Sequence, residues 1–344
     1  SHKRKISASP PAKGGLCDPK VRQTHGYYNV DPKNPARKYF FWFFESRFEP
    51  STDPIFLWLE GGPGESGLAS AVGYNGPCII NKDGATTSIN PYSWTNRANG
   101  IWLDQPVGVG FSKGSPAEET PAETAENMYN AMNAGLPKCL KQIDLCTKNV
   151  KTCPDANEGC KDLVLGPLVE NGVDFYKIGE KCSDPHQSEP AGCYDEDLPR
   201  NVPAYYGQSS VKLFLGVRGS YIIDSDPVFY KLNHFVLVNS DFLLPNLLDK
   251  GLRVLVIAGD RDYICNFIGL KRWMLGLKWA GQSAFNKASD VVYKDTTGQV
   301  IGLRRSINRG QYCFVQVSGG SHGPVTQNPR GVLDTVNDFF SSRS

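Results

Sequence analysis

The chain has 344 residues, enough to bury a sizeable core in one large domain or two ordinary ones. Its 37 lysines and arginines nearly balance 35 aspartates and glutamates, and the net charge of +2 gives no reason to expect a nucleic-acid partner. No apolar run approaches the roughly twenty residues that a membrane span needs, and the amino terminus lacks the apolar core of a signal peptide, so the sequence is interpreted as a mature or trimmed chain.

Residues 1–16 are polar and contain Pro and Gly, which predicts a flexible N-terminal arm. Five short apolar runs after it predict buried strands that end in polar or glycine-rich loops. These runs are residues 39–44, 55–59, 101–103, 253–257 and 314–317. Apolar residues at helical spacing over 329–340 predict a helix. Strands and helices in this order indicate an α/β fold with a mostly parallel sheet and flanking helices.

Six of the ten cysteines fall between residues 139 and 193. With the Pro, Asp and Gly content of 136–205, they predict a disulfide-rich insertion that separates two parts of the core, 17–135 and 206–344. The spacing of seven residues between the first four is unlike the close pairs of a zinc site, so no metal is expected. Disulfides indicate the secretory pathway, hence a vacuolar, lysosomal or extracellular location, although a reduced cytosolic protein with buried thiols stays an alternative.

The loop after the predicted strand at 55–59 reads Glu60-Gly-Gly-Pro-Gly-Glu-Ser-Gly67. Its glycines let backbone amides approach a ligand closely, which suits an oxyanion hole. The glycines also have the spacing of a dinucleotide-binding loop, but Pro63 stiffens the turn and no acidic residue ends a second strand, so no cofactor is expected. A purely structural glycine turn is the other alternative.

Two loops near the end of the chain carry an acid and a base. Asp260 and Asp262 follow the predicted strand at 253–257, and His322 follows the one at 314–317. The carboxyl ends of parallel strands share one edge of a sheet, so either carboxylate could orient the histidine. Taken singly, the carboxylates could form an Asx turn with a surface ion pair, and a loop histidine is more often solvated than catalytic, but the order Asp then His is that of α/β-hydrolase triads.

Longer blocks of the sequence resemble the serine carboxypeptidases of the carboxypeptidase Y type, which have an α/β-hydrolase fold. They cover most of residues 17–342 and agree in order and spacing as well as in letters. The blocks are YFFWFFESR, WLEGGPG, NPYSWTNRAN, LDQPVGVGFS, LPKCLKQIDLC, RVLVIAGDRDYICN, WAGQSAFNKA and GGSH. The resemblance implies an exopeptidase that acts on peptide or protein C-termini through an acyl-enzyme.

Site residues follow from the same resemblance, position by position. Asp262 is implied to be the triad acid and His322 the general base. Gly61 and Gly62 stand at the oxyanion hole, and Cys265 takes the place of a free thiol on the substrate side. Glu60 and Tyr74 stand where the family binds the terminal carboxylate of the substrate, and a charged Glu60 would repel that group.

The resemblance also implies three disulfides and leaves three cysteines unassigned. The implied pairs are Cys139 with Cys160, Cys146 with Cys153, and Cys182 with Cys193. The cysteines without an assigned partner are Cys17, Cys78 and Cys313.

The sequence departs from the family at the nucleophile. The family's serine stands in a Gly-Glu-Ser-Tyr-Ala-Gly elbow, and no such segment occurs here; several tens of residues are missing around 126–132. Ser66 is a weak substitute, because Leu68 stands where an elbow needs glycine, and its alternative role is hydrogen bonding within the loop. Two hypotheses follow: a serine carboxypeptidase relative whose own activity is open, or a non-catalytic protein that binds peptides or stabilises a partner. The oligomeric state is not predicted.

Overall fold

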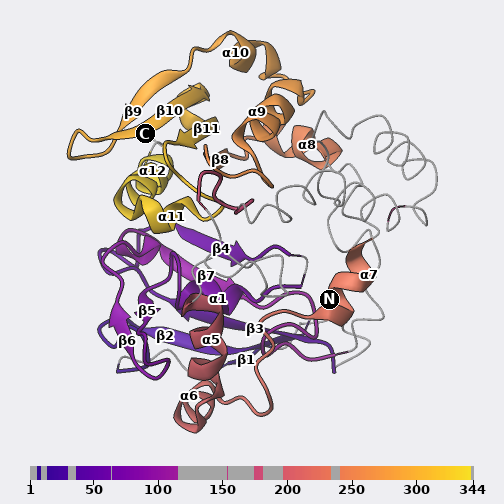
Figure 1. The fold of residues 1–344 in the computed structure, drawn as a ribbon, viewed down its shortest axis with the longest axis vertical. Coiled ribbons are helices and arrows are strands. Elements are labelled where there is room, and N and C mark those ends of the chain that lie inside the picture. Colours follow the sequence, from indigo (N-terminus) through magenta and orange to yellow (C-terminus); the bar gives the residue numbers. More distant parts are fainter. Residues whose placement is uncertain are drawn as a thin grey trace. The chain divides into compact units, whose positions relative to one another are not determined.

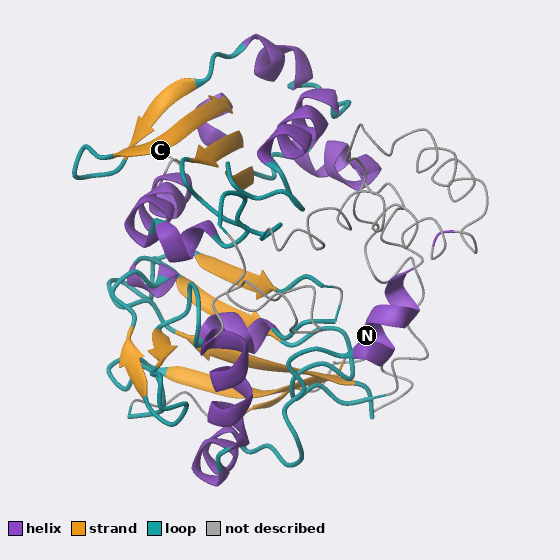
Figure 2. Cartoon of the chain, viewed as in Figure 1, coloured by secondary structure: helices purple, strands orange, loops and turns teal. Residues whose placement is uncertain are grey.

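The computed structural model describes residues 6–8, 14–29, 36–62, 64–114, 153, 174–180, 197–233 and 241–341. The chain divides into two compact units. Unit 1 comprises Ser1–Glu119 and Asp195–Leu232, and unit 2 comprises Thr120–Tyr194 and Asn233–Ser344. Each unit has its own sheet and helices (Figures 1 and 2). Each also has its own apolar core.

Unit 1 is built on a five-stranded sheet with the strand order β1-β2-β3-β7-β4. These strands are β1 (Ile6–Ala8), β2 (Gln23–Asn29), β3 (Lys38–Phe44), β7 (Asn99–Leu103) and β4 (Ile55–Leu59). Neighbours are antiparallel except β4 and β7, which are parallel. A separate antiparallel ribbon consists of β5 (Cys78–Ile80) and β6 (Thr87–Ile89). The helices are α1 (Gly67–Ala71), η1 (Trp94–Asn96), α5 (Asp197–Gly207), α6 (Ser209–Leu215) and α7 (Asp226–Leu232).

The core of unit 1 is mainly aromatic. Alternation along β3 puts Phe40, Trp42 and Phe44 on one face of the sheet, and all three are fully buried. They belong to one cluster with Trp102 of β7 and Tyr206 of α5. A buried aromatic side chain removes roughly 150–250 Å² from water, so this cluster is the main apolar support of the unit.

The predicted strand at 55–59 forms as β4, but the expectation that it is buried on both faces is wrong. Ile55, Leu57 and Leu59 are half or more exposed, at 63%, 53% and 50%. On the other face, Phe56 and Trp58 pack edge-on against Trp94. A continuous apolar run predicts a strand covered on both faces, but β4 is the last strand of its sheet and only one of its faces is packed.

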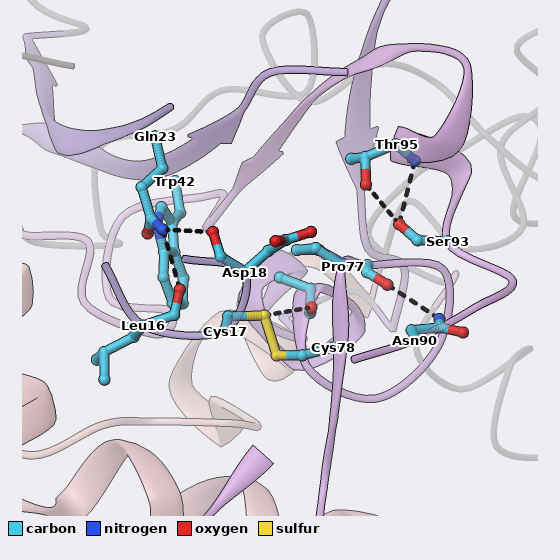
Figure 3. The surroundings of a disulfide bond; sticks show 12 residues. Leu16, Cys17, Asp18, Gln23, Trp42, Pro77, Cys78, Asn90, Ser93 and Thr95 are labelled. Atoms are coloured by element: carbon cyan, nitrogen blue, oxygen red, sulfur yellow. Dashed lines mark hydrogen bonds between the residues drawn. A yellow bond between two sulfur atoms is a disulfide. The ribbon is translucent and has the colours of Figure 1, made fainter. Parts of the chain in front are cut away.

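A disulfide between Cys17 and Cys78 ties the segment before β2 to β5 (Figure 3). Beside it, the Arg47 guanidinium donates to the Asp18 carboxylate and to the Pro77 carbonyl, each at 2.7 Å. The sequence had given neither cysteine a partner. Of the six cysteines in the three predicted pairs, only Cys153 is among the described residues, and it is disulfide-bonded. The other five lie outside the described residues, so the predicted pairs stay predictions.

Unit 2 contains a four-stranded sheet with the order β8-β11-β10-β9. Its strands are β8 (Val254–Gly259), β11 (Tyr312–Val317), β10 (Val300–Ile307) and β9 (Val291–Lys294). β8 and β11 are parallel and the other two pairs antiparallel. The helices are η5 (Asp241–Leu243), α8 (Leu244–Asp249), α9 (Phe267–Gly276), α10 (Gln282–Lys287), η6 (Asn308–Gly310), α11 (Pro324–Gln327) and α12 (Pro329–Ser341).

The apolar pattern of unit 2 places its elements as predicted. Tyr312 and Phe314 of β11 pack with Met274 of α9 and Phe285 of α10 in one buried cluster. The helix predicted over 329–340 is α12, whose apolar side chains are buried along one stripe. The strands predicted at 253–257 and 314–317 are β8 and β11, so all five predicted strands and the helix are confirmed.

The α/β class is confirmed, with one difference in detail. Among the described strands only β4–β7 and β8–β11 pair in parallel, because the other neighbours mostly follow one another along the chain and turn back as antiparallel pairs.

The predicted division into two core parts, 17–135 and 206–344, with an insertion over 136–205 stays a prediction, since most of 136–205 lies outside the described residues. Two local facts bear on it: Ile6–Ala8 of the predicted arm form β1, and α5 continues across position 205. No helix in the described part of the chain is both long and apolar enough to cross a bilayer.

Candidate active site

Asp262 and His322 meet at one edge of the unit 2 sheet. β8 and β11 run in parallel with Gly259 opposite Val317, so their carboxyl ends lie side by side. The loops that leave these ends carry the two residues. Nδ1 of His322 lies 2.9 Å from Oδ2 of Asp262, and the predicted acid and base are therefore in hydrogen-bond contact.

The two loops touch along their backbones before they reach this pair. A Cβ at Gly259 would lie 2.2 Å from the Ser321 carbonyl oxygen, so only glycine permits the approach. The Arg261 amide donates to the Gly320 carbonyl at 2.9 Å, and the Asp260 carboxylate accepts from the Gly319 amide at 2.8 Å. Asp260 thus binds the backbone of the other loop, and Asp262 is the carboxylate in contact with the histidine.

The carboxylate and the imidazole differ in exposure. The Asp262 side chain is 4% exposed, whereas that of His322 is 36% exposed. Burial by itself lowers the pKa of His322, but the hydrogen bond with Asp262 and the nearby Cys265 sulfur outweigh it and raise the pKa from 6.5 to about 10. The ring is thus held as an imidazolium at neutral pH, with one side open to solvent.

A segment of unit 2 around Tyr176 contacts His322, and no sequence motif indicated it. The Tyr176 carbonyl accepts from the His322 amide at 2.9 Å, and the two rings lie 5.0 Å apart between centroids. The same segment is held to the loop after β8, because the Phe175 carbonyl accepts from the Tyr263 amide at 3.1 Å. The sequence signal for it is weak: an aromatic pair within a polar stretch of the predicted insertion.

Cys265 is the third side chain at this edge. It is a free, partly exposed thiol, and its amide donates to Oδ1 of Asp262 at 3.1 Å. One ligand-type atom from each of Asp262, Cys265 and His322 lies within 4.8 Å of the other two, and they form the one such group within the described ranges. A cation held by all three would have to displace the hydrogen bond between Asp262 and His322.

The glycine loop of unit 1 follows β4 and exposes two amides. Gly61 and Gly62 are exposed, and within the described residues their N–H groups donate to no acceptor. Gly62 and Gly64 have φ of +113° and +106°, a conformation that glycine adopts without strain. The geometry leaves these two amides available to a ligand.

Glu60 and Tyr74 are linked through Ser70 in the same unit. Oε2 of Glu60 accepts from the Trp58 indole at 3.0 Å and from the Ser70 hydroxyl. The Ser70 carbonyl accepts from the Tyr74 amide at 3.1 Å. Both Glu60 and Tyr74 are partly buried. The two positions expected to meet a substrate carboxylate are thus connected by hydrogen bonds through Ser70.

Ser66 has the geometry of a structural residue. It is fully buried, caps the amino end of α1 by accepting from the Leu68 amide at 3.2 Å, and donates to the Asp104 carboxylate. Its oxygen also accepts from the Tyr221 hydroxyl at 2.7 Å. The sequence had offered Ser66 both as a nucleophile and as a loop hydrogen-bonding residue, and these contacts favour the second.

Asp104, which follows β7, is a buried carboxylate that the sequence did not single out. The Phe111 amide donates to it at 2.9 Å, and a Cβ at Gly110 would lie 2.0 Å from its oxygen. Burial raises the pKa of Asp104 from 3.8 to about 6, although its hydrogen bonds oppose the rise. Its partners all come from unit 1, where it holds the glycine loop against the loop after β7.

Comparison with solved structures identifies the fold class. A prohormone-processing carboxypeptidase from Saccharomyces cerevisiae superposes with a TM-score of 0.68 at 17% sequence identity, over 95% of this chain and 94% of that one. The chain therefore has the α/β-hydrolase fold.

Sequence comparison gives the family. The family model described as serine carboxypeptidase matches residues 13–140 and 122–342. A carboxypeptidase Y homolog from Arthroderma benhamiae is 31% identical over 93% of this chain and 76% of its own length. A homolog from Leptosphaeria maculans is 28% identical over 94% and 74%. The chain belongs to the serine carboxypeptidase family, and the resemblance stated above is confirmed.

Proposed function

We propose that this chain acts on the C-terminal end of peptides or proteins as a hydrolase that releases the last residue. The observation that carries the proposal is the contact of 2.9 Å between His322 and the buried Asp262. In the proposed chemistry, His322 shuttles the proton between nucleophile and leaving amine, and Asp262 orients the ring and stabilises the imidazolium.

The family resemblance, and no contact in the structure, gives the glycine loop of unit 1 its roles in this proposal. The amides of Gly61 and Gly62, which donate to no acceptor among the described residues, would bind the oxyanion of the tetrahedral intermediate. Glu60 and Tyr74 would border the terminal carboxylate of the substrate. The two donors on Glu60, from Trp58 and Ser70, offset part of the repulsion that its charge exerts on that carboxylate.

The nucleophile is the open element of the proposal. The alignment with the Arthroderma benhamiae relative spans 391 positions, yet it covers 93% of a 344-residue chain, or about 320 residues. About 70 positions of the relative thus have no counterpart here. This supports the expectation that the serine elbow is missing, and it favours a second candidate function, a non-catalytic protein that binds peptide C-termini.

One experiment separates these candidates. The purified chain is incubated with N-blocked dipeptides, and free amino acid is quantified; labelling by a fluorophosphonate and binding of the same dipeptides by calorimetry are measured in parallel. Release of amino acid that is lost in a folded His322→Gln variant supports the hydrolase. Binding without release supports the second candidate, and neither binding nor release contradicts both.

We further propose that the protein works in the secretory pathway, in a vacuole, lysosome or outside the cell. The disulfide between Cys17 and Cys78 and the bonded state of Cys153 support an oxidising compartment. Fractionation of tagged protein tests this: recovery in the cytosol with all thiols reduced would contradict it.

A further inference from the structure

Each of the two exposed amides of the glycine loop belongs to a peptide group whose carbonyl is anchored. The Glu60 carbonyl accepts from the side-chain amide of Gln105, with Nε2 at 3.1 Å from the oxygen. The Gly61 carbonyl accepts from the Glu65 amide at 3.2 Å. A trans peptide group is planar, and its N–H points away from its carbonyl. Anchoring these two carbonyls therefore fixes the directions of the Gly61 and Gly62 N–H groups.

The two anchors differ in kind. The anchor on the Gly61 carbonyl is a backbone bond within the glycine loop itself. The anchor on the Glu60 carbonyl is a partly buried side chain from the loop after β7, 45 residues further along the chain. The same loop holds the other end of the glycine loop, where Asp104 accepts from the Ser66 hydroxyl. The loop after β7 thus contacts the glycine loop on both sides of the two exposed amides.

The path of the glycine loop does not depend on Gln105 alone. The Ser66 amide donates to the Ile223 carbonyl at 3.0 Å, and the Gly64 carbonyl accepts from the Ser225 amide at 3.1 Å. These backbone bonds tie the loop to the segment before α7. What Gln105 adds is the orientation of one peptide group, the one that carries the Gly61 N–H.

A hydrogen bond on a carbonyl also changes the N–H of the same peptide group. The carbonyl that accepts becomes more polarised, and the N–H becomes a stronger donor. A donor that already points at the place where negative charge develops needs no reorganisation during the reaction. The side chain of Gln105 therefore both aims and strengthens the Gly61 donor.

We infer that Gln105 is a positioning residue, which aims the Gly61 N–H at an anionic oxygen of the substrate through the Glu60 carbonyl. The inference rests on the hydrolase function proposed above, in which this amide binds the oxyanion of the tetrahedral intermediate. Gln105 acts on the reaction only through the peptide group that it holds.

The first test measures the direction of the amide. Gln105→Met keeps the length of the side chain and removes the donor. Residual dipolar couplings, which report the direction of each N–H, are measured by nuclear magnetic resonance on the whole isotope-labelled chain. We expect the coupling of Gly61 to change and that of Gly62 to stay, because the Glu65 amide still holds the Gly61 carbonyl. An unchanged Gly61 coupling overturns the inference.

A matched control is available in the same unit. The side chain of Gln208 also donates to a backbone carbonyl, that of Ala85, at 3.1 Å. Gln208→Met therefore removes a similar hydrogen bond away from the glycine loop, and it should leave the Gly61 coupling unchanged.

The second test measures hydrolysis of an N-blocked dipeptide. The oxyanion exists only in the transition state and the intermediate, so the loss should appear in kcat and not in KM. Removing an oxyanion donor outright costs roughly 10²–10³-fold, and loss of its aim should cost less. We expect kcat of Gln105→Met to fall by roughly 10-fold to 100-fold with KM within about threefold. Gln208→Met should keep both constants.

Each other result decides the matter. A changed Gly61 coupling with an unchanged kcat, or a loss confined to KM, overturns the inference and leaves the proposed hydrolase function intact. No hydrolysis by the unaltered chain overturns the proposed function. The Gly61 amide signal then decides: a shift on addition of the dipeptide that Gln105→Met loses supports positioning, and no such shift overturns it. If Gln105→Met does not fold, Gln105→Asn, whose side chain is one methylene shorter, replaces it.

Discussion

Ser66 in unit 1 and His322 in unit 2 occupy corresponding places in their sheets. Each lies in the loop after one strand of a parallel pair, and each contacts a carboxylate from the loop after the other strand, Asp104 or Asp262. The difference is exposure: Ser66 and Asp104 are wholly buried, whereas a third of the His322 side chain is open. The same arrangement of loops therefore buries a hydrogen-bonded pair in unit 1 and leaves an imidazole partly exposed in unit 2.

The largest effect is expected when the imidazole of His322 is removed, and this change tests the difference between the two units most directly. His322→Gln should lower kcat for an N-blocked dipeptide by about 10⁴-fold or more, because the proton shuttle is lost. Ser66→Ala, the corresponding change in unit 1, should keep kcat within a few-fold while it lowers the free energy of unfolding by about 1–2 kcal/mol through loss of the helix cap. A kcat that falls equally in both variants would contradict the distinction.

The second prediction concerns the titration of His322. Nuclear magnetic resonance of the imidazole should give a pKa near 10, and Asp262→Asn should bring it down towards 6.5 because the negative partner is gone. The folded chain holds this proton more tightly than the unfolded chain. The stabilisation is therefore complete below pH 6.5 and is lost as pH rises through about 10. A midpoint near 6.5 in the unaltered chain would contradict this.

The third prediction concerns the buried carboxylate of Asp104 and the hydrogen bonds that it accepts. Asp104→Ala should lower the free energy of unfolding in urea by about 3 kcal/mol, because the Ser66 hydroxyl and two backbone amides lose their acceptor inside the protein. The raised pKa of Asp104, about 6, means that its contribution favours folding below pH 3.8 and fades as pH rises through 6. In Asp104→Asn that part of the pH dependence should be flat; an unchanged slope between pH 4 and 6 would assign it to another group.

The smallest expected effect is at Glu60. Glu60→Gln removes the charge but keeps an oxygen for Trp58 and Ser70. Affinity for an N-blocked dipeptide with a free carboxylate should rise roughly threefold to tenfold, measured by calorimetry. The dipeptide amide, which has no terminal charge, serves as the control and should bind both forms equally. Equal gains for the two ligands would place Glu60 away from the terminal carboxylate.

The pair Asp262–His322 was predictable because it depends on local patterns. Two apolar strands, each followed by a glycine-rich polar loop, put both residues at one edge once the strands are parallel neighbours. The local pattern left Asp260 and Asp262 as alternatives, and the family resemblance implied Asp262. The structure shows that Asp262 is the carboxylate in contact with the ring.

Other parts of the two sites could not be read from the chain. The backbone carbonyl of Tyr176 accepts from the His322 amide. Every residue has such a carbonyl, so the sequence cannot indicate which one makes this contact. Asp104 had no motif because burial, and not its neighbours in sequence, makes it unusual. The exposed side of β4 was missed because an apolar run has the same pattern whether one face or both are covered.

The buried disulfide in unit 1 sets the redox conditions under which the chain can be handled. Cys17 is 7% exposed and Cys78 fully shielded, whereas the thiol of Cys265 is accessible. A small monothiol at low concentration will meet Cys265 first and keep it reduced while the cross-link survives. Strong dithiol reductants can reduce the disulfide, which closes a loop of 61 residues and stabilises the folded state by about 4 kcal/mol. Loss of activity in such reagents would therefore report unfolding of unit 1, not the chemistry of unit 2.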